Sequence, residues 1–315
     1  MSKIIDDIYW IEVNIKNEIF YFFVTEPYLY SNISESYGKI IYSTTPFFTK
    51  GNVNIIENKT NLYKTYLRNE NDVMYGVLDL EINSYATKFG FEKGCLIDEN
   101  LNKIIRKEVI QIQKSKEIIL IEDYKNYERL FNEISTFYET NIEDLKLTGG
   151  GQLFNKKLND MHDLDLVVTI YSYEQLEKIN LLKKPKYAKN VTEFNRIWPL
   201  RWYSFNNEIV CPFFIYGKIG IPIEEVQYTG ENFNGVLTIK NDEYGIFNMP
   251  IYQIDNQIKY IAFRLTIVRG WFKLGDKIKI NNGKVYKIKK GLLKENTVII
   301  INDFSSQLII KERNL

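Results

Sequence analysis

Residues 145–168 place a triple-glycine turn ahead of two aspartates on an apolar strand, and this order limits the folds open to the chain. Asp163 and Asp165 are two residues apart, so a strand would direct both carboxylates to one face. Such carboxylates repel each other, and proteins usually keep them where a cation lies between them. The glycines at 149–151 precede a predicted short helix, whose N–H groups and dipole favour an anion such as phosphate. The stretch therefore predicts a phosphate-binding turn followed by a divalent-metal site.

Length and composition are those of an ordinary globular protein with more than one domain. The chain has 315 residues, 45% of them hydrophobic and 26% charged, enough for two or three domains with substantial cores. No apolar run approaches the roughly 18 residues that span a bilayer, and the N-terminus lacks the basic-then-apolar layout of a signal peptide. Cys95 and Cys211 are too far apart in sequence to indicate a zinc site or a disulfide framework. We therefore expect a reduced, cytoplasmic protein without a membrane partner.

Strand-forming segments dominate both ends of the chain, and the clearest helices lie in the middle. Residues 1–118 are rich in β-branched and aromatic residues, which is typical of a β-rich accessory domain. Within residues 119–230, an apolar stripe predicts a helix over 124–139. Ser172 and Gln175 form a capping box that would begin a later helix. We take 119–230 as the core of the protein.

The second half of this core predicts one more short helix and then a hairpin. Thr192 can cap a helix through Ile197, which Pro199 would end. Two strands follow, and residues 206–207 are suited to the turn between them. Glu208 opens the second of these strands, whose next residues are apolar.

Residues 231–315 form a strand-rich and basic C-terminal segment. Its short strands suggest a small closed barrel, and residues 282–283 predict a tight hairpin turn. Residues 258–315 carry a net charge of +9, whereas the rest of the chain sums to −8. This division suggests a polyanionic partner, although the outward face of an amphipathic strand pair would also carry alternating lysines. The candidate nucleic-acid contacts are Lys277, Lys279, Lys284, Lys287, Lys289 and Lys290.

Residues 145–216 resemble the DNA polymerase β-like nucleotidyltransferase superfamily. The family pattern is an apolar strand, a Gly-Gly or Gly-Ser turn, a spacer, Asp-x-Asp on a strand and a third acid on a later strand. Residues 147–150 match the first part, and Asp163 and Asp165 match the second. Glu208 lies 43 residues beyond Asp165, where the third acid is expected. Two departures are Glu208 in place of the commoner Asp and Gly150 in place of a phosphate-contacting serine, so a phosphate contact must come from the backbone.

The resemblance implies an α+β fold, with a nucleotidyltransferase-like mixed sheet and flanking helices. The β-rich N-terminal domain and the small, basic, barrel-like C-terminal domain would be additions to it. It implies transfer of a nucleoside monophosphate from a nucleoside triphosphate to a hydroxyl acceptor, with RNA expected as the acceptor and pyrophosphate released. Asp163, Asp165 and Glu208 would bind Mg²⁺ in a two-metal site that could also take Mn²⁺. The nucleotide would contact Gly149, Gly150, Gly151 and Arg201.

Other interpretations of the same residues remain open. A nucleic-acid-binding protein with an inactive nucleotidyltransferase core would share the basic domain. A glycosyltransferase also uses Asp-x-Asp to hold a metal and a nucleotide sugar, but it has no reason for a glycine turn upstream. Asp163 and Asp165 could be a solvated strand face, and Glu208 a surface carboxylate of the hairpin. For His162 the favoured interpretation is a loop histidine without a role, and for Arg201 it is a solvated arginine.

Overall fold

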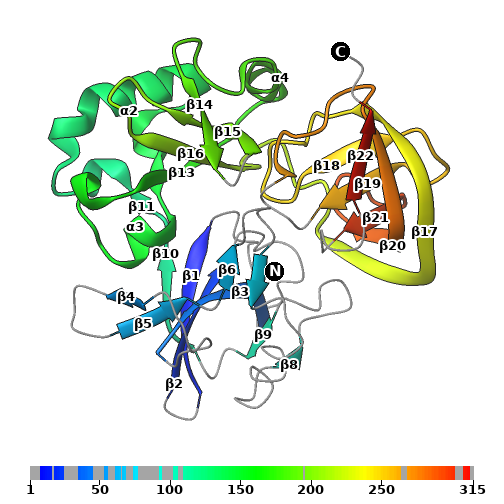
Figure 1. The fold of residues 1–315 in the computed structure, drawn as a ribbon, viewed down its shortest axis with the longest axis horizontal. Coiled ribbons are helices and arrows are strands. Elements are labelled where there is room, and N and C mark those ends of the chain that lie inside the picture. The colour runs from blue at the N-terminus through cyan, green and yellow to red at the C-terminus, as the bar shows by residue number, and fades with distance from the viewer. Residues whose placement is uncertain are drawn as a thin grey trace.

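The computed structural model has three parts, which Figure 1 shows as an N-terminal group of strands, a central sheet with helices and a C-terminal barrel. Strands outnumber helices, so the α+β class expected from the sequence is confirmed at this coarse level. The structure describes residues 8–15, 18–24, 35–44, 53–55, 61–64, 66–68, 74–76, 92–93, 102–105, 109–193, 196–263, 268–301 and 308–312.

The N-terminal part is built from antiparallel strands, as its β-branched and aromatic composition predicts. Its main sheet has the order β10-β1-β2-β3-β5-β4, with β9 joining β3 to β8, and β6 pairs with β7 separately. The strands are β1 (Tyr9–Ile15), β2 (Glu18–Val24), β3 (Glu35–Ser43), β4 (Val53–Ile55), β5 (Asn61–Lys64), β6 (Tyr66–Arg68), β7 (Met74–Gly76), β8 (Glu92–Lys93), β9 (Asn102–Ile105) and β10 (Val109–Lys114).

The central sheet has the order β11-β12-β13-β16-β15-β14 and is mixed, because β13 and β16 run parallel while the other pairs are antiparallel. Its strands are β11 (Lys116–Glu117), β12 (Lys146–Leu147), β13 (Asp163–Thr169), β14 (Lys189–Glu193), β15 (Arg196–Tyr203) and β16 (Ile209–Ile215). Its helical elements are η2 (Ile118–Leu120), α2 (Tyr124–Tyr138), η3 (Ile142–Asp144), α3 (Gly149–Leu153), η4 (Leu158–Asp160) and α4 (Tyr173–Leu182).

The two long helices form where the sequence predicts them. The stripe of α2 buries Leu130, Phe131 and Ile134, and burial of each such side chain contributes roughly 1.5–3 kcal/mol. Ser172 caps α4 by accepting a hydrogen bond from the backbone N–H of Gln175 at 3.1 Å. Of the helices in the described ranges, none is both long and apolar enough to cross a membrane.

The two faces of β13 pack against different neighbours. Leu164, Leu166 and Val168 belong to the hydrophobic cluster that contains the buried side chains of α2 and α4. Val167, on the other face, packs with Cys211 and Phe213 of β16 and with N-terminal residues. Side chains alternate between the two faces along a strand, so Asp163 and Asp165 share this second face with Val167.

The C-terminal strands close into a barrel, as the sequence suggested. The order β17-β18-β19-β21-β20-β22 is completed by pairing between β17 and β20. The strands are β17 (Glu225–Asn241), β18 (Ile251–Ile254), β19 (Tyr260–Phe263), β20 (Lys277–Lys290), β21 (Thr297–Ile301) and β22 (Leu308–Glu312). The outer face of the barrel packs on the central sheet through Tyr286 and Ile288, which join the same cluster as α2.

Two local predictions are wrong. The helix expected from Thr192 to Ile197 is not formed, because Thr192 and Glu193 at the end of β14 pair with Ile197 and Arg196 at the start of β15. The hairpin expected at 282–283 is absent, since β20 continues through these residues with Asn282 at φ 58°. Residue 230, after which the C-terminal domain is expected to begin, lies inside β17, and β17 pairs with β20 from Glu225 onward.

Candidate functional site

Asp163 and Asp165 lie at the start of β13, where the parallel strand β16 also begins. Asp163 is in register with Ile209, and Asp165 is in register with Cys211. Partners in register share a face of the sheet, so both carboxylates lie on the face opposite α2. Both aspartates are partly buried. The prediction that the two carboxylates share one face is confirmed by this register.

The glycine segment (residues 149–154, which begin with the three glycines) lies directly against Asp165. The backbone N–H of Thr148 donates to the carbonyl of Asp165 at 2.8 Å. Gly149 has φ +64°, and a Cβ added to it would lie 2.0 Å from Oδ2 of Asp165. Glycine is therefore required here twice, by the left-handed backbone and by the close approach of the carboxylate.

The glycines do not precede a helix but form one. Gly149 is the first residue of α3, which has only five residues. So short a helix sums few peptide dipoles, and the dipole contribution expected for phosphate binding is correspondingly small. Any phosphate bound here would depend on individual N–H groups of this segment.

Two buried arginines lie close to the aspartates. Arg201 of β15 has a side chain that is 9% exposed, and its Nη2 lies 2.9 Å from Oδ2 of Asp163. Arg269, between β19 and β20, donates to the carbonyl of Pro212 at 2.6 Å and lies over the ring of Phe213. Arg201 thus lies beside Asp163 as a buried partner rather than a solvated side chain, and its contact with a nucleotide stays a prediction. Sequence reasoning missed Arg269.

Electrostatics at Asp165 differ from those of an ordinary surface carboxylate. The pKa of Asp165 is raised to about 8, mainly by burial and then by the neighbouring charge of Asp163, while the charge of Arg201 opposes the shift. Cys211 is buried beside it, and burial followed by the charge of Asp165 raises the pKa of that thiol to about 12. The two carboxylates are therefore incompletely neutralised by the arginines, which is the condition under which an added cation is favoured.

The raised pKa of Asp165 predicts a pH-dependent stability in the absence of divalent cations. Its folded-state pKa exceeds the unfolded value, so its contribution is fully present below the unfolded pKa and is lost as pH rises toward about 8. We expect the melting temperature of the wild type to fall between about pH 5 and about pH 9 more steeply than that of Asp165→Asn. Thermal unfolding by circular dichroism in the presence of EDTA measures this. Parallel pH profiles of the two proteins would contradict it.

Glu208 lies apart from the two aspartates. It precedes β16 by one residue. The alternation of side chains along this strand therefore puts it on the same face as Val210, which packs with α2. Its Oε2 accepts a hydrogen bond from Ser204 Oγ at 3.0 Å, and its charge raises the pKa of Tyr127 of α2, second to burial. The described residues contain no group of three or more His, Cys, Asp or Glu side chains that could hold a metal. The structure therefore does not supply Glu208 as the third carboxylate.

His162 directly precedes Asp163 and is exposed, in keeping with a loop residue.

The candidate basic contacts on the C-terminal barrel do not form one row. Lys277 and Lys279 point outward from the barrel, because the residues alternating with them are buried inside it. The register of β20 shifts near Asn282, so Lys287 lies on the opposite face of the strand from Lys277 and Lys279. Its Nζ is 3.0 Å from Oε2 of Glu295. Lys290 forms an ion pair with Glu224, Lys284 is partly buried and Lys289 is exposed.

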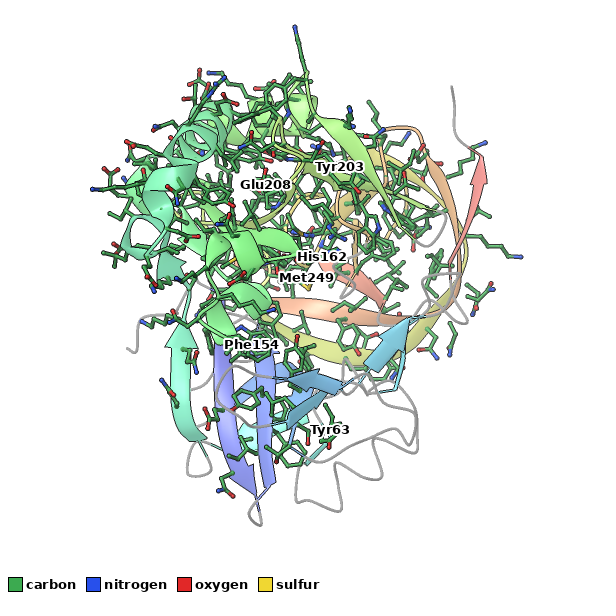
Figure 2. The ribbon with its side chains drawn as sticks, turned by 60° about the vertical axis from the view of Figure 1, so that its left-hand side comes forward. Tyr63, Phe154, His162, Tyr203, Glu208 and Met249 are labelled. Carbon is green, nitrogen blue, oxygen red and sulfur yellow. The ribbon has the colours of Figure 1, made fainter. Side chains whose placement is uncertain are left out.

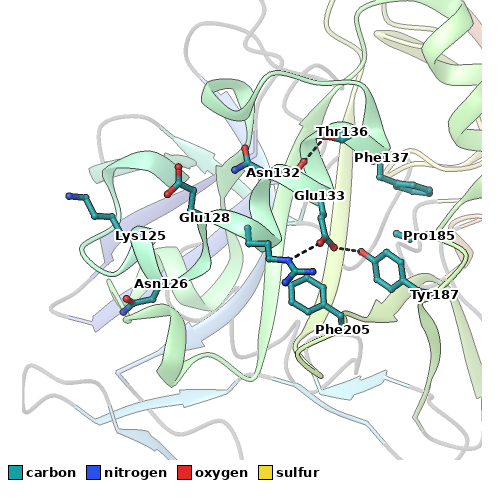
Figure 3. Close-up of a pocket in the computed structure, with 11 residues that line it drawn as sticks. Lys125, Asn126, Glu128, Asn132, Glu133, Thr136, Phe137, Pro185, Tyr187 and Phe205 are labelled. Atoms are coloured by element: carbon teal, nitrogen blue, oxygen red, sulfur yellow. Dashed lines mark hydrogen bonds and ion pairs between the residues drawn. The ribbon is translucent and has the colours of Figure 1, made fainter.

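A hollow among the described residues lies along α2, away from the aspartates (Figure 3). It has a volume of about 970 Å³. Glu133 connects its walls by accepting hydrogen bonds from Arg129 at 3.3 Å and from the Tyr187 hydroxyl at 3.2 Å. Phe205 lies beneath the Arg129 guanidinium, 5.0 Å away. Acidic and basic side chains are mixed here, so the hollow shows no preference for an anion.

Comparison of the chain with protein-family models, with curated proteins and with solved structures yields no match.

Proposed function

We propose that this protein is a Mg²⁺-dependent nucleotidyltransferase that moves a nucleoside monophosphate from a nucleoside triphosphate to a hydroxyl group. The observation that carries the proposal is the contact between the glycine segment and the aspartate pair. Gly149 lies so close to Asp165 that a Cβ would overlap its carboxylate. A phosphate on the glycine backbone and a cation on the carboxylates would thus be neighbours. Phosphoryl transfer needs that juxtaposition.

The residues of the site fit Mg²⁺ that arrives with the nucleotide. Mg²⁺ is commonly held by one or two carboxylates, with waters and substrate phosphates completing its octahedral shell. Asp163 and Asp165 supply two carboxylates, and burial together with the charge of Asp163 already raises the pKa of Asp165. When bound, the ion neutralises charge on the phosphoryl oxygens and lowers the pKa of the attacking hydroxyl. A second protein-held metal has less support, because Glu208 faces α2.

In the proposed reaction the acceptor oxygen attacks the α-phosphorus. A new phosphorus–oxygen bond forms as the bond to pyrophosphate breaks, and the hydroxyl proton passes to water. The backbone of the glycine segment would orient the triphosphate. Arg201 brings a positive charge to within 2.9 Å of Asp163, where it would also stabilise negative charge on the leaving pyrophosphate. Cys211 and Arg269 fix the adjoining strand β16 and take no part in bond making.

One experiment separates this proposal from other phosphoryl chemistry. The protein is incubated with Mg²⁺, total RNA and a nucleoside triphosphate labelled at either the α- or the γ-phosphorus. Nucleotidyl transfer puts the α-label on the acceptor and releases the γ-label as pyrophosphate. If neither label reaches RNA, protein or small-molecule acceptors, or if only the γ-label is transferred, the proposal is wrong.

The runner-up function is nucleic-acid binding by a protein whose core is inactive. The ion pair between Arg201 and Asp163 favours it, because that contact already satisfies part of the carboxylate charge without a metal. Under this alternative Mg²⁺ would bind no more tightly to the wild type than to a variant without the aspartates.

The basic C-terminal domain is the proposed contact for a nucleic-acid acceptor, and Lys277 and Lys279 are the residues to test. Both point outward from the barrel, whereas Lys287 lies on the other side of β20, beside Glu295. We expect Lys277→Glu/Lys279→Glu to weaken RNA binding about tenfold or more near 0.1 M salt and to flatten its salt dependence. Lys287→Glu alone should change binding less. Fluorescence anisotropy with labelled RNA measures both, and equal effects would contradict the assignment of the face.

A further inference from the structure

The N-terminal domain contacts the glycine segment through Trp10 of β1. The Trp10 side chain is almost fully buried, and its indole Nε1 donates a hydrogen bond to the carbonyl of Gly149 at 3.0 Å. The two residues are 139 positions apart in sequence. A residue from the accessory domain therefore holds the first residue of α3, the one that contacts Asp165.

The same domain holds the rest of α3 by two further contacts. Gln152 donates through Nε2 to the carbonyls of Gln113 at 3.1 Å and Lys114 at 2.6 Å, both on β10. Phe154 follows α3 and packs edge-on against Tyr42 of β3, with ring centroids 5.2 Å apart. Figure 2 shows Phe154 at the border between the core and the N-terminal strands. The glycine segment is thus fixed at its beginning, middle and end by one domain.

The glycine segment needs such support because its own sequence does little to fix it. Glycine loses more backbone entropy on ordering than any other residue type, and this segment has three in succession. A helix of five residues is far below the length at which helices are stable alone. The preceding strand β12 has only two residues. Contacts from outside the core must therefore select the conformation in which Gly149 lies against Asp165.

We propose that the N-terminal β domain positions the glycine segment for the nucleotide, with Trp10 as the positioning residue. The inference rests on the proposed function for its consequence, which is tighter binding of the triphosphate. Its structural part stands independently of activity. Trp10 touches no reacting atom, so its effect is transmitted through the Gly149 backbone.

Amide hydrogen exchange of the full-length protein tests the structural part. Trp10→Phe removes the N–H and some ring volume, and we expect exchange in residues 149–154 to become about fivefold faster, the loss of one buried hydrogen bond. Replacement of Trp10 with β-(3-benzothienyl)alanine keeps the ring shape while sulfur replaces the N–H, and it should give the same acceleration. Leu62→Ala removes volume from the same hydrophobic cluster and should leave exchange in 149–154 at the wild-type rate after correction for global stability. Unchanged exchange in the benzothienyl protein would overturn the inference.

Nucleotide binding and kinetics then test the consequence. We expect both Trp10 replacements to raise the KM for the Mg²⁺-bound triphosphate severalfold while kcat changes less, because the loss falls on nucleotide positioning rather than on the aspartates. Equal losses in Leu62→Ala would reduce Trp10 to a packing role and contradict the inference. If wild-type protein neither binds nor uses nucleotide, the proposed function fails, and the exchange data still decide whether Trp10 fixes the segment.

Discussion

Asp165→Asn is expected to reduce nucleotidyl transfer by at least about a thousandfold, the scale on which removal of charge stabilisation in a transition state is felt. Asparagine keeps the size of the side chain but loses the negative charge that would bind Mg²⁺. Because the wild-type carboxyl is destabilised by burial and by Asp163, the variant should be at least as stable as the wild type at alkaline pH without metal. Initial rates with α-labelled nucleotide, together with melting temperatures, measure both effects.

Glu208→Gln is the matched control for this prediction. Glu208 bonds to Ser204 and lies beside Tyr127, on the side of α2. We expect this variant to keep transfer within about threefold of the wild type, because the residue contacts no reacting group. A thousandfold loss in Glu208→Gln with an active Asp165→Asn would reverse the assignment of the site.

Arg201→Leu is expected to lower the free energy of unfolding by about 3–5 kcal/mol at neutral pH without divalent cations, as when one partner of a buried ion pair is removed. The Arg201 side chain is 9% exposed, and that of its partner Asp163 is 30% exposed. Loss of the guanidinium removes a positive charge that lies near both carboxylates, Asp163 and Asp165. Saturating Mg²⁺ or Mn²⁺ should restore part of the loss, because a cation that binds the folded state stabilises it. Urea unfolding with and without metal measures this.

Lys178→Met provides the comparison for Arg201→Leu. Lys178 pairs with Glu139 at 2.8 Å, but both side chains are roughly half exposed. Solvent screens such a pair, so its removal should change the free energy of unfolding far less than Arg201→Leu does and should show no metal dependence. Similar losses in both variants, or a loss in Arg201→Leu that metal leaves unchanged, would contradict a cation site beside Asp163.

The elements that depend on short-range patterns could be predicted from the sequence. The apolar stripe of α2, the capping box at Ser172 and the alternation that puts Asp163 and Asp165 on one face all depend on spacings of a few residues. The hairpin before Glu208 was also predicted in place, with Asn207 at φ 66° in its turn. Patterns of this kind act locally, and tertiary contacts left these in place, whereas strand pairing overrode equally local signals at Thr192 and at residues 282–283.

Residues whose position depends on register or on distant partners could not be predicted. Glu208 has the right spacing in sequence, but a shift by one residue along a strand moves a side chain to the other face, and Glu208 lies on the face that α2 covers. The irregularity at Asn282 separates Lys279 from Lys287 in the same way. Trp10 reaches Gly149 only after two domains have packed together. No local signal in the sequence encodes contacts of this range.

The central claim is that Asp163 and Asp165 hold a divalent cation together with a nucleotide on the glycine segment. Electron paramagnetic resonance of Mn²⁺, titrated into the protein with a non-hydrolysable nucleoside triphosphate, tests it most directly. We predict saturable binding that strengthens with the nucleotide, shows magnetic coupling to its phosphorus nuclei and is lost in Asp163→Asn/Asp165→Asn. Mn²⁺ binding that is absent from the wild type, or that persists unchanged in the double variant, would contradict the account.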